Sequence, residues 1–333
     1  MEILSACDTD IEKAAASLAA GLLVAFPTET VYGLGGDAFN SSALAKIFEV
    51  KNRPHFDPLI VHIADMETLS RITDIESLSP AAKERLAILT KKLWPGPLTL
   101  VLPKKAVIPG LATAGLPSVA VRFPSHPVAQ KLIRLSTGAV AAPSANPFGH
   151  LSPTRAAHVK NQLGERVDFI IDGGKTEVGL ESTVLDICGE TPVILRHGGT
   201  SREAIEELIG SVAVSLDSST QTEAQVSPGQ LKNHYAPRTP LYICKRGELD
   251  SIPLAPNEGR LYFSPGILCL APETTRVLSK ASDITKALTE AAANFFDMLH
   301  ELDNLGLECI RAEMAPAHGL GEAINDRLRR AQT

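Results

Sequence analysis

Two cations lie two residues apart at the point where a helical pattern breaks. Lys51 and Arg53 follow a helix-like pattern over residues 40–50 and precede a β-branched run at 59–63 that predicts a buried strand. Arg53 and Asp57 each precede a proline, which pushes a residue out of the α region. Irregular turns between a helix and a central strand often hold anion-binding side chains in α/β folds. Taken alone, such a pair is more often a basic turn exposed to solvent. Whether Lys51 and Arg53 bind an anion therefore depends on the other polar segments of the chain.

Two further polar segments come directly after predicted strands. The strand at 22–26 enters a loop from Thr28 to Gly36 that carries three glycines, two threonines, a carboxylate and a tyrosine. This loop is neither a Walker motif nor a GxGxxG fingerprint, so by itself it is a weak signal for a nucleotide. The small-residue strand at 139–142 leads into a Pro-rich turn in which Ser144 and Asn146 offer neutral hydrogen-bonding groups. Small residues there would let a ligand approach the backbone closely.

Three more side chains have two interpretations each. Ser152 before a proline predicts a helix N-cap, and a helix N-terminus can also bind an anion. Arg122 interrupts the apolar strand 119–123, so it either faces water on an edge strand or points inward to hold an anion. The pattern does not separate these two orientations. Trp94, beside Pro-Gly-Pro, is expected to be a packing anchor rather than a platform for a ligand.

Strands and helices alternate along the chain, which predicts an α/β architecture. The 333 residues suffice for two domains, and we expect a first domain at 1–215 and a second at 239–333. Residues 216–238 between them start with a polar stretch that has no core-forming residues, which predicts a linker. Strands and helices also alternate in the second domain, which predicts a small parallel, Rossmann-like sheet.

Composition narrows the function classes. A formal net charge of −6, with 44% hydrophobic and 21% charged residues, is typical of a globular protein and argues against a generic electrostatic grip on nucleic acid. The five cysteines form no CxxC pair, so we expect no zinc site or disulfide framework, and a cytoplasmic location. The apolar run at 14–26 is too short to span a bilayer, so no membrane partner is expected.

Taken together, the segments closely resemble the YrdC-like threonylcarbamoyl-AMP synthase family in its longer, two-domain form. The motifs that carry the resemblance are Phe26-Pro27-Thr28-Glu29-Thr30-Val31-Tyr32-Gly33-Leu34-Gly35, Lys51-x-Arg53, Pro58-Leu59-Ile60-Val61-His62-Ile63, Trp94-Pro95-Gly96-Pro97, Val119-Ala120-Val121-Arg122, Ala142-Pro143-Ser144-Ala145-Asn146, Ile171-Asp172-Gly173-Gly174, Glu181-Ser182-Thr183-Val184 and His234-Tyr235-Ala236-Pro237. They cover residues 10–240. The remainder matches more loosely, by position and by the basic end Arg327-Leu328-Arg329-Arg330.

The resemblance implies a strongly twisted mixed sheet with helices and a concave cleft. It implies that L-threonine, bicarbonate and ATP are joined into threonylcarbamoyl-AMP and pyrophosphate, with Mg²⁺ as cofactor. This product serves the threonylcarbamoyladenosine modification beside the tRNA anticodon, so a downstream threonylcarbamoyl transferase is an expected partner. Direct binding of tRNA is not required.

The resemblance also assigns roles by motif position. Lys51 and Arg53 would clamp the phosphates, Arg through its planar fork and Lys as a point charge. The residues that would hold threonine are Thr30, His62, Arg122, Ala142 and Ser182, with Arg122 on the carboxylate of the amino acid. The residues that would line the ATP pocket are Arg53, Asp57, Ser118, Ser144, Asn146, Ser152 and Arg196, with Tyr235 as a lid. No metal ligands are assigned.

The chain departs from the family pattern near the basic pair. Asn52 replaces a commoner glycine, and Asp57 stands where asparagine is usual. A carboxylate there would repel phosphate unless it helps to bind Mg²⁺ or caps a backbone amide. His197-Gly198-Gly199 replaces the more usual Pro-Gly-Ala, a mild change in a turn.

Two other functions compete with the synthase. A carbamoyl-transferring relative, as in hydrogenase-maturation proteins, would carry CxxC pairs that this sequence lacks. A non-catalytic RNA-binding module is disfavoured by the net charge and by an aromatic content of only 5%.

Overall fold

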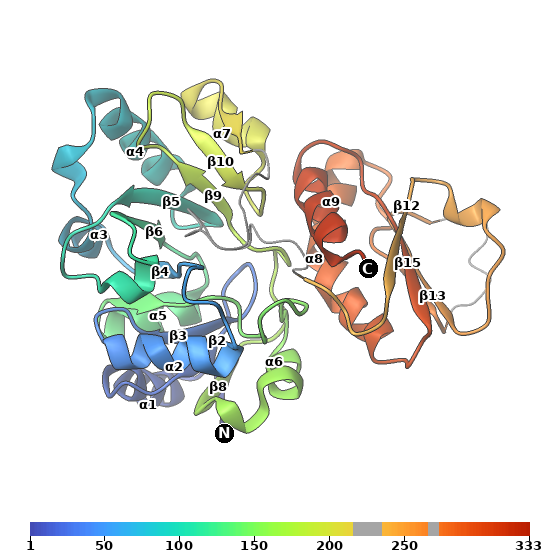
Figure 1. Cartoon of the computed structure of the whole chain (residues 1–333), viewed down its shortest axis with the longest axis horizontal. Coiled ribbons are helices and arrows are strands. Elements are labelled where there is room, and N and C mark those ends of the chain that lie inside the picture. Colours follow the sequence, from blue (N-terminus) through green and yellow to red (C-terminus); the bar gives the residue numbers. More distant parts are fainter. Residues whose placement is uncertain (216–234, 266–272) are drawn as a thin grey trace.

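The computed structural model describes residues 1–215, 235–265 and 273–333, which form two sheets with flanking helices (Figure 1). Residues 216–234, most of the predicted linker, lie outside the described residues. The helices are α1 (Asp8–Ala19), α2 (Ser41–Lys51), α3 (Met66–Ile72), α4 (Pro80–Leu93), α5 (Pro127–Leu135), α6 (Ala156–Leu163), α7 (Arg202–Ile209), α8 (Ile284–Asp303) and α9 (Leu320–Ala331). None of these described helices combines the length and apolar character that crossing a membrane requires.

The larger sheet mixes parallel and antiparallel pairs, as the resemblance implied. Its described strands lie in the spatial order β1 (Glu2–Ser5), β8 (Phe169–Asp172), β2 (Val24–Phe26), β3 (Gly33–Asp37), β7 (Ala139–Ala141), β4 (Ile60–Ile63), β6 (Ser118–Arg122), β5 (Leu98–Pro103), β9 (Thr183–Asp186), β10 (Val193–Arg196) and β11 (Ala213–Val214). The strand β4 pairs parallel with β6 and antiparallel with β7, and all four of its residues are buried. The prediction of a buried central strand after the basic turn is therefore confirmed.

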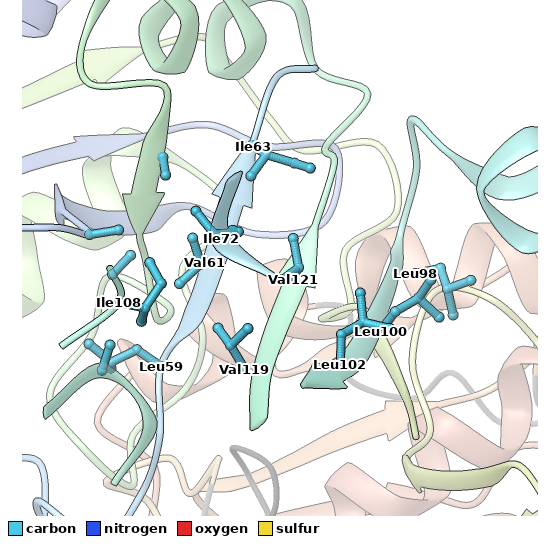
Figure 2. Close-up of a cluster of buried hydrophobic side chains, with 14 of the residues drawn as sticks. Leu59, Val61, Ile63, Ile72, Leu98, Leu100, Leu102, Ile108, Val119 and Val121 are labelled. Carbon is cyan, nitrogen blue, oxygen red and sulfur yellow. The ribbon is translucent and has the colours of Figure 1, made fainter. Parts of the chain in front are cut away.

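Side-chain alternation gives the centre of this sheet one face that is wholly apolar and one that combines polar side chains with a small apolar cluster. On one face the side chains of β4, β6 and β5 form a single core, which includes Val61, Val121 and Leu100 (Figure 2). Successive side chains of a strand point to opposite faces, so His62, Arg122 and Thr99 point the other way. The register places His62 opposite Arg122 and Arg122 opposite Thr99. A row of polar side chains therefore crosses the sheet on the face away from this core.

The glycine-rich segment that we predicted as a loop is partly a strand. β3 runs antiparallel to β2 and is wholly buried. A Cβ atom on Gly35 would lie 2.8 Å from the ring of Phe26 and 2.9 Å from Val140 Cγ1. The glycines therefore let β3 pack closely against its neighbours, although glycine is normally disfavoured in strands.

The second domain has a small sheet in which all described pairs are parallel, as predicted. Its strands lie in the order β12 (Leu241–Cys244), β15 (Cys309–Glu313), β13 (Glu258–Tyr262) and β14 (Thr275–Val277). The helices α8 and α9 lie between this sheet and the first domain (Figure 1). Both helices therefore form the contact surface between the domains.

An ionic cluster on α8 holds the domains together. Asp297 accepts two hydrogen bonds from Arg155 of the first domain, at 2.7 and 2.9 Å, and lies 2.9 Å from Lys175 Nζ. Burial acts to raise the pKa of this carboxyl, but the bonds and charges of Arg155 and Lys175 outweigh it and lower the pKa to about 2. Asp297 is therefore an ionised counter-charge for cations of the first domain.

A glycine makes a second close contact between the domains. Gly179 has φ +73°, and a Cβ atom there would overlap the backbone of Ala292 and lie 2.6 Å from Ala293 Cα on α8. Gly174 has φ +82° but open space around its position. Both glycines therefore have a positive φ, but only Gly179 packs closely against α8.

We expect Gly179→Ala to destabilise the protein more than Gly174→Ala does. Positive φ costs a non-glycine residue about 1–2 kcal/mol at either position. Overpacking against α8 adds about 1–3 kcal/mol at position 179 only. The midpoints of urea unfolding of the two variants measure the difference. Equal midpoints would show that close packing of Gly179 against the backbone of α8 does not contribute to stability.

Candidate active site

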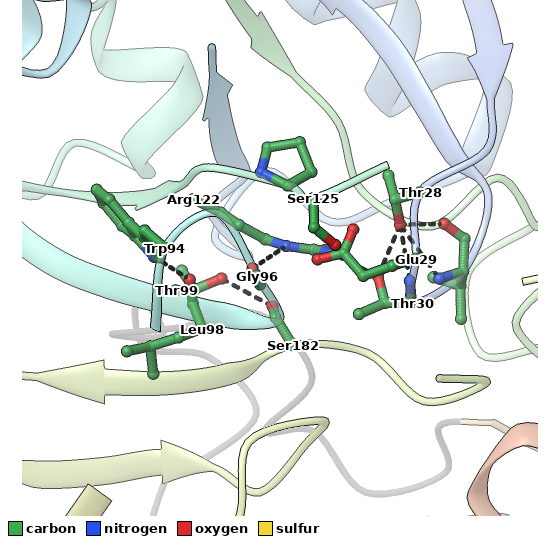
Figure 3. Close-up of polar contacts among 12 residues, drawn as sticks. Thr28, Glu29, Thr30, Trp94, Gly96, Leu98, Thr99, Arg122, Ser125 and Ser182 are labelled. Carbon is green, nitrogen blue, oxygen red and sulfur yellow. Dashed lines mark hydrogen bonds and ion pairs between the residues drawn. The ribbon is translucent and has the colours of Figure 1, made fainter. Parts of the chain in front are cut away.

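Arg122 points inward and is held by three groups. Only 3% of its surface is exposed. Its Nη1 donates to Thr30 Oγ1 at 2.8 Å, its Nε donates to the carbonyl of Gly96 at 3.3 Å, and its Nη2 lies 2.8 Å from Glu29 Oε1 (Figure 3). Burial acts to raise the pKa of Glu29, but the charge and hydrogen bond of Arg122 outweigh it and lower this pKa. Of the two orientations that the sequence allowed, the structure has the inward one, with an ionised partner.

The five residues predicted to hold threonine line one cavity. They are Thr30, His62, Arg122, Ala142 and Ser182, and the cavity has a volume of about 50 Å³. The Ser182 hydroxyl lies 2.7 Å from Thr99 Oγ1 on the polar row, and the Thr30 hydroxyl lies 2.7 Å from Thr28 Oγ1 (Figure 3). The result is a small polar pocket with hydroxyl groups around one guanidinium.

His62 is buried and neutral at pH 7. Its ring lies edge-on to Phe26, with centroids 6.4 Å apart, and its Nδ1 has no hydrogen-bond partner among the described residues. Burial, followed by the positive charge of Arg122, lowers the pKa of His62 to about 3. An unsatisfied polar atom on a cavity wall is a group to which a ligand can bind.

Arg53 forms a second buried cationic wall of the same cavity. Its Nη2 lies 2.9 Å from Asp57 Oδ2 and donates to the carbonyl of Pro58 at 2.7 Å. Burial raises the pKa of Asp57, and the charges of Arg53, Lys51 and Arg196 offset part of that rise. Asp57 does not line the cavity. It is the counter-charge of Arg53, and it allows the guanidinium to be buried.

Lys51 lies behind the cavity rather than on its wall. Its side chain is 1% exposed, and its Nζ donates to the carbonyls of Ser144, at 2.5 Å, and Asn146. Burial, and then the charge of Arg53, lower the pKa of Lys51 well below its usual value. Asn52 next to it has φ 52°, a left-handed conformation that favours glycine and that asparagine tolerates. This explains why asparagine can replace the commoner glycine.

Lys51 thus fixes the turn that presents Ser144, and Ser144 lines the cavity. Asn146 is turned away, because its Nδ2 donates to the carbonyls of Pro147 and His150. Arg196 lines the cavity from β10 and donates to the Ser182 carbonyl at 2.9 Å. Ser118 is half-buried at the start of β6 and does not line the cavity. The predicted ATP residues are therefore split between the wall and the support behind it.

The predicted capping role of Ser152 is wrong. The helix α6 starts at Ala156 with Arg155 in the N-cap position and without a side-chain cap. Ser152 lies three residues before that position, and its hydroxyl donates to the carboxylate of Glu181. Ser152 therefore supports a carboxylate on the cavity wall.

Tyr235 closes the cavity from the second domain's side. Its ring is 1% exposed, lines the cavity and packs against Phe296 of α8, with centroids 5.8 Å apart. It lies at the edge of the described residues, and only positions 235–238 of the predicted linker are described.

Sequence reasoning assigned no role to Glu29 or Glu181. Both sit in motifs that we recognised, but their function depends on partners far away in the chain, Arg122 for one and Arg327 for the other. One feature of the sequence could have indicated their role, namely a carboxylate inside a segment that is expected to bind anions. Such a carboxylate needs a cationic partner, and the sequence does not show which cation this is.

A pH dependence of stability follows from the buried, neutral His62. Its folded pKa of about 3 lies below the unfolded value of 6.5, so the unfolded chain binds more protons between these pH values. The stability of the wild type therefore falls as pH drops through this window, by up to about 1.4 kcal/mol per pH unit from this group. We expect the advantage of the wild type over His62→Gln in thermal midpoint to shrink from pH 7.5 to pH 4.5.

The other histidines are common to both proteins and cancel in this comparison. Replacement of the exposed His150 by glutamine is the matched control for the chemical change itself. A difference between the wild type and His62→Gln that stays constant with pH would contradict the neutral, buried state.

Both domains match family models of known proteins. Residues 16–198 match the Sua5–YciO–YrdC family model, described as telomere recombination, and residues 200–333 match the model of the threonylcarbamoyl-AMP synthase C-terminal domain. The threonylcarbamoyl-AMP synthase of Bacillus subtilis is 44% identical over 333 residues, covering 98% of this chain and 94% of the relative. The enzyme of the same name from Pyrococcus abyssi is 40% identical over 96% of this chain and 93% of its own length.

A solved structure agrees over the whole fold. The crystal structure of P. abyssi Sua5 complexed with L-threonine has a TM-score of 0.87 and 37% identity, and covers 99% of this chain and 97% of that one. The chain therefore belongs to the two-domain Sua5–YciO–YrdC family of threonylcarbamoyl-AMP synthases.

Proposed function

We propose that this protein makes threonylcarbamoyl-AMP and pyrophosphate from L-threonine, bicarbonate and ATP. The observation that carries the proposal is one cavity with two kinds of wall. A guanidinium among hydroxyl groups, Arg122 with Thr30 and Ser182, suits an amino acid, and the buried cations Arg53 and Arg196 suit a phosphate chain. The relatives that carry this activity in their names cover nearly the whole chain.

The amino-acid side follows from charge and hydrogen bonding. Arg122 would bind the carboxylate of threonine, and the hydroxyl groups of Thr30 and Ser182 can both donate to and accept from the threonine hydroxyl. The neutral ring of His62 would be a hydrogen-bonding partner and not a charged one. In this arrangement the amino group of threonine takes up CO₂ derived from bicarbonate to give a carbamate.

At the phosphates, the reaction needs positive charge that stabilises the transition state and correct placement of the two substrates. It does not need a residue that activates the nucleophile. An oxygen of the carbamate attacks the α-phosphorus, the new oxygen–phosphorus bond forms, and the bond to the β-phosphate breaks. Pyrophosphate leaves with the electron pair. The nucleophile is already an anion, so positive charge near the phosphates and correct placement supply the catalysis. Arg53 and Arg196 provide this charge at the wall, and Lys51 fixes the turn that presents Ser144.

Mg²⁺ is part of the proposal as an ion that arrives with the nucleotide. The described residues contain no group of three or more His, Cys, Asp or Glu that could hold a metal ion. The acidic side chains around the cavity, Glu29, Asp57 and Glu181, each face an arginine. Magnesium in nucleotide sites commonly uses substrate phosphates and waters with few protein ligands, so an ion that arrives with ATP does not need a cluster of carboxylates. When bound, it would neutralise charge on the phosphates.

The cavity must enlarge to admit ATP. Ligand pockets measure about 300–1,000 Å³, several times the volume of about 50 Å³ found here. Tyr235, near the end of the predicted linker, supplies one wall of the cavity, which supports its proposed role as a lid.

The proposed product determines the next step. Threonylcarbamoyl-AMP is a mixed anhydride, so a transferase that delivers the threonylcarbamoyl group to tRNA is the proposed downstream partner. The enzyme itself need not bind tRNA. A cytoplasmic location belongs to the same proposal, and the four cysteines among the described residues are all free thiols.

Pyrophosphate release with one substrate omitted at a time tests the function. We expect release that needs ATP, threonine, bicarbonate and Mg²⁺ together. Release without threonine would point to the carbamoyl-transferring alternative or to an idle ATPase. A folded protein that releases none under any combination would favour the RNA-binding alternative.

Arg53 should contribute charge to the reaction itself. Arg53→Ala alone would leave Asp57 buried without its partner, at a cost of about 3–5 kcal/mol, so the informative variant is Arg53→Ala with Asp57→Asn. We expect pyrophosphate release by this double variant to fall about 10²–10³-fold relative to Asp57→Asn. Turnover equal to that of Asp57→Asn would remove Arg53 from the catalytic step.

A further inference from the structure

One arginine of the second domain is completely enclosed beside the cavity. Arg327 on α9 has 0% exposure, whereas Arg329 two residues later is exposed. A buried guanidinium is costly unless anions or acceptors surround it, so its partners explain why it is there.

The partners of Arg327 belong to the cavity wall. Its Nε donates to Glu181 Oε2 at 3.0 Å, across the boundary between the domains. Its guanidinium lies 4.9 Å from the ring centroid of Tyr235, within cation–π range. Asp326 on the same helix accepts from Nη1 at 2.7 Å. Glu181 and Tyr235 both line the cavity, so Arg327 contacts two of its walls without lining it.

The negative charge of Glu181 is unfavourable in a site that binds a polyanion such as ATP. Glu181 is 6% exposed and lies on the wall that also carries Arg196. An uncompensated negative charge there would repel the phosphates of ATP. Two groups contact it directly, the Ser152 hydroxyl on one oxygen and Arg327 on the other, and the charges of Arg196 and Lys51 act on it from nearby. Arg327 supplies the only full charge among the two direct contacts.

Arg327 stays charged in this position. Burial acts to lower the pKa of its guanidinium, but Tyr235, Glu181 and Asp326 outweigh burial and raise the pKa. Arg327 is therefore a cation over the whole pH range in which the protein would work.

We propose that Arg327 is a positioning residue of the ATP site, which neutralises Glu181 and holds the ring of Tyr235 against the cavity. The proposal rests on the proposed function, because it assumes that ATP binds in this cavity. It gives the second domain a part in nucleotide binding: α9 delivers the charge that makes the wall at Glu181 compatible with phosphates.

The test breaks the same ion pair from its two ends. Arg327→Gln leaves Glu181 negative, whereas Glu181→Gln leaves Arg327 positive and keeps an acceptor for Ser152. Calorimetry on the full chain measures the Kd values of ATP and of threonine. Loss of charge neutralisation predicts that Arg327→Gln weakens ATP binding by about tenfold or more. We expect Glu181→Gln not to weaken it.

Further variants separate charge from packing. The double variant Arg327→Gln with Glu181→Gln should bind ATP within about threefold of the wild type, because the two charges cancel. Arg327→Lys keeps the charge but loses the planar guanidinium that contacts Glu181, Asp326 and Tyr235, so its ATP affinity should lie between those of the wild type and Arg327→Gln. Exposed Arg329→Gln is the control for removing a charge from α9. The Kd of threonine should stay the same in all variants.

Three results would overturn the inference. Unchanged ATP binding by Arg327→Gln would show that Glu181 needs no neutralisation. Equal weakening by Glu181→Gln and Arg327→Gln would show that the contact acts only by joining the domains. Failure of the double variant to recover ATP binding would exclude charge as the cause. A wild-type protein that binds threonine but not ATP would instead overturn the proposed function itself.

Discussion

Burial of positive charge is the constraint on which the site depends. The cavity needs cations with little water around them, and each of three buried arginines has its own carboxylate: Arg122 with Glu29, Arg53 with Asp57, and Arg327 with Glu181. A buried charge without its partner costs several kcal/mol, so these pairs fix the guanidinium groups before any substrate arrives. The pairs come from several strands, loops and one helix of the second domain, so the fold as a whole holds the site in place.

The sheet decides where these charges can lie. Alternation along β4, β6 and β5 sends the apolar side chains into the core and leaves His62, Arg122 and Thr99 in register on the opposite face. A slip of one residue in this register would exchange the two faces and destroy both core and site. The same hydrogen-bonded ladders that stabilise the first domain therefore also align its polar row.

The sequence predicted the structural features that depend on residues close together in the chain. The β-branched runs predicted the central strands, and the residues before Pro54 and Pro58 predicted the irregular turn that carries Arg53. Three features depend on distant contacts that the sequence does not reveal. β3 is a strand because its glycines pack against Phe26 and Val140, Ser152 supports Glu181 and does not cap a helix, and Lys51 holds the turn at Ser144 from behind. The five residues that motif matching proposed for threonine do line one cavity, and their role in binding threonine stays a prediction. Pairings such as Glu181 with Arg327, 146 residues apart, need the folded chain.

The central claim is that one cavity joins a carbamate of threonine to the α-phosphate of ATP. The most direct measurement is ¹³C NMR of the product formed by the full chain from ATP, threonine, Mg²⁺ and ¹³C-bicarbonate. The account predicts a new carbamoyl resonance that is split by phosphorus, because the labelled carbon is bonded through one oxygen to the α-phosphate. An adenylate whose phosphorus is attached to the carboxylate of threonine, with the label left in bicarbonate, would contradict it.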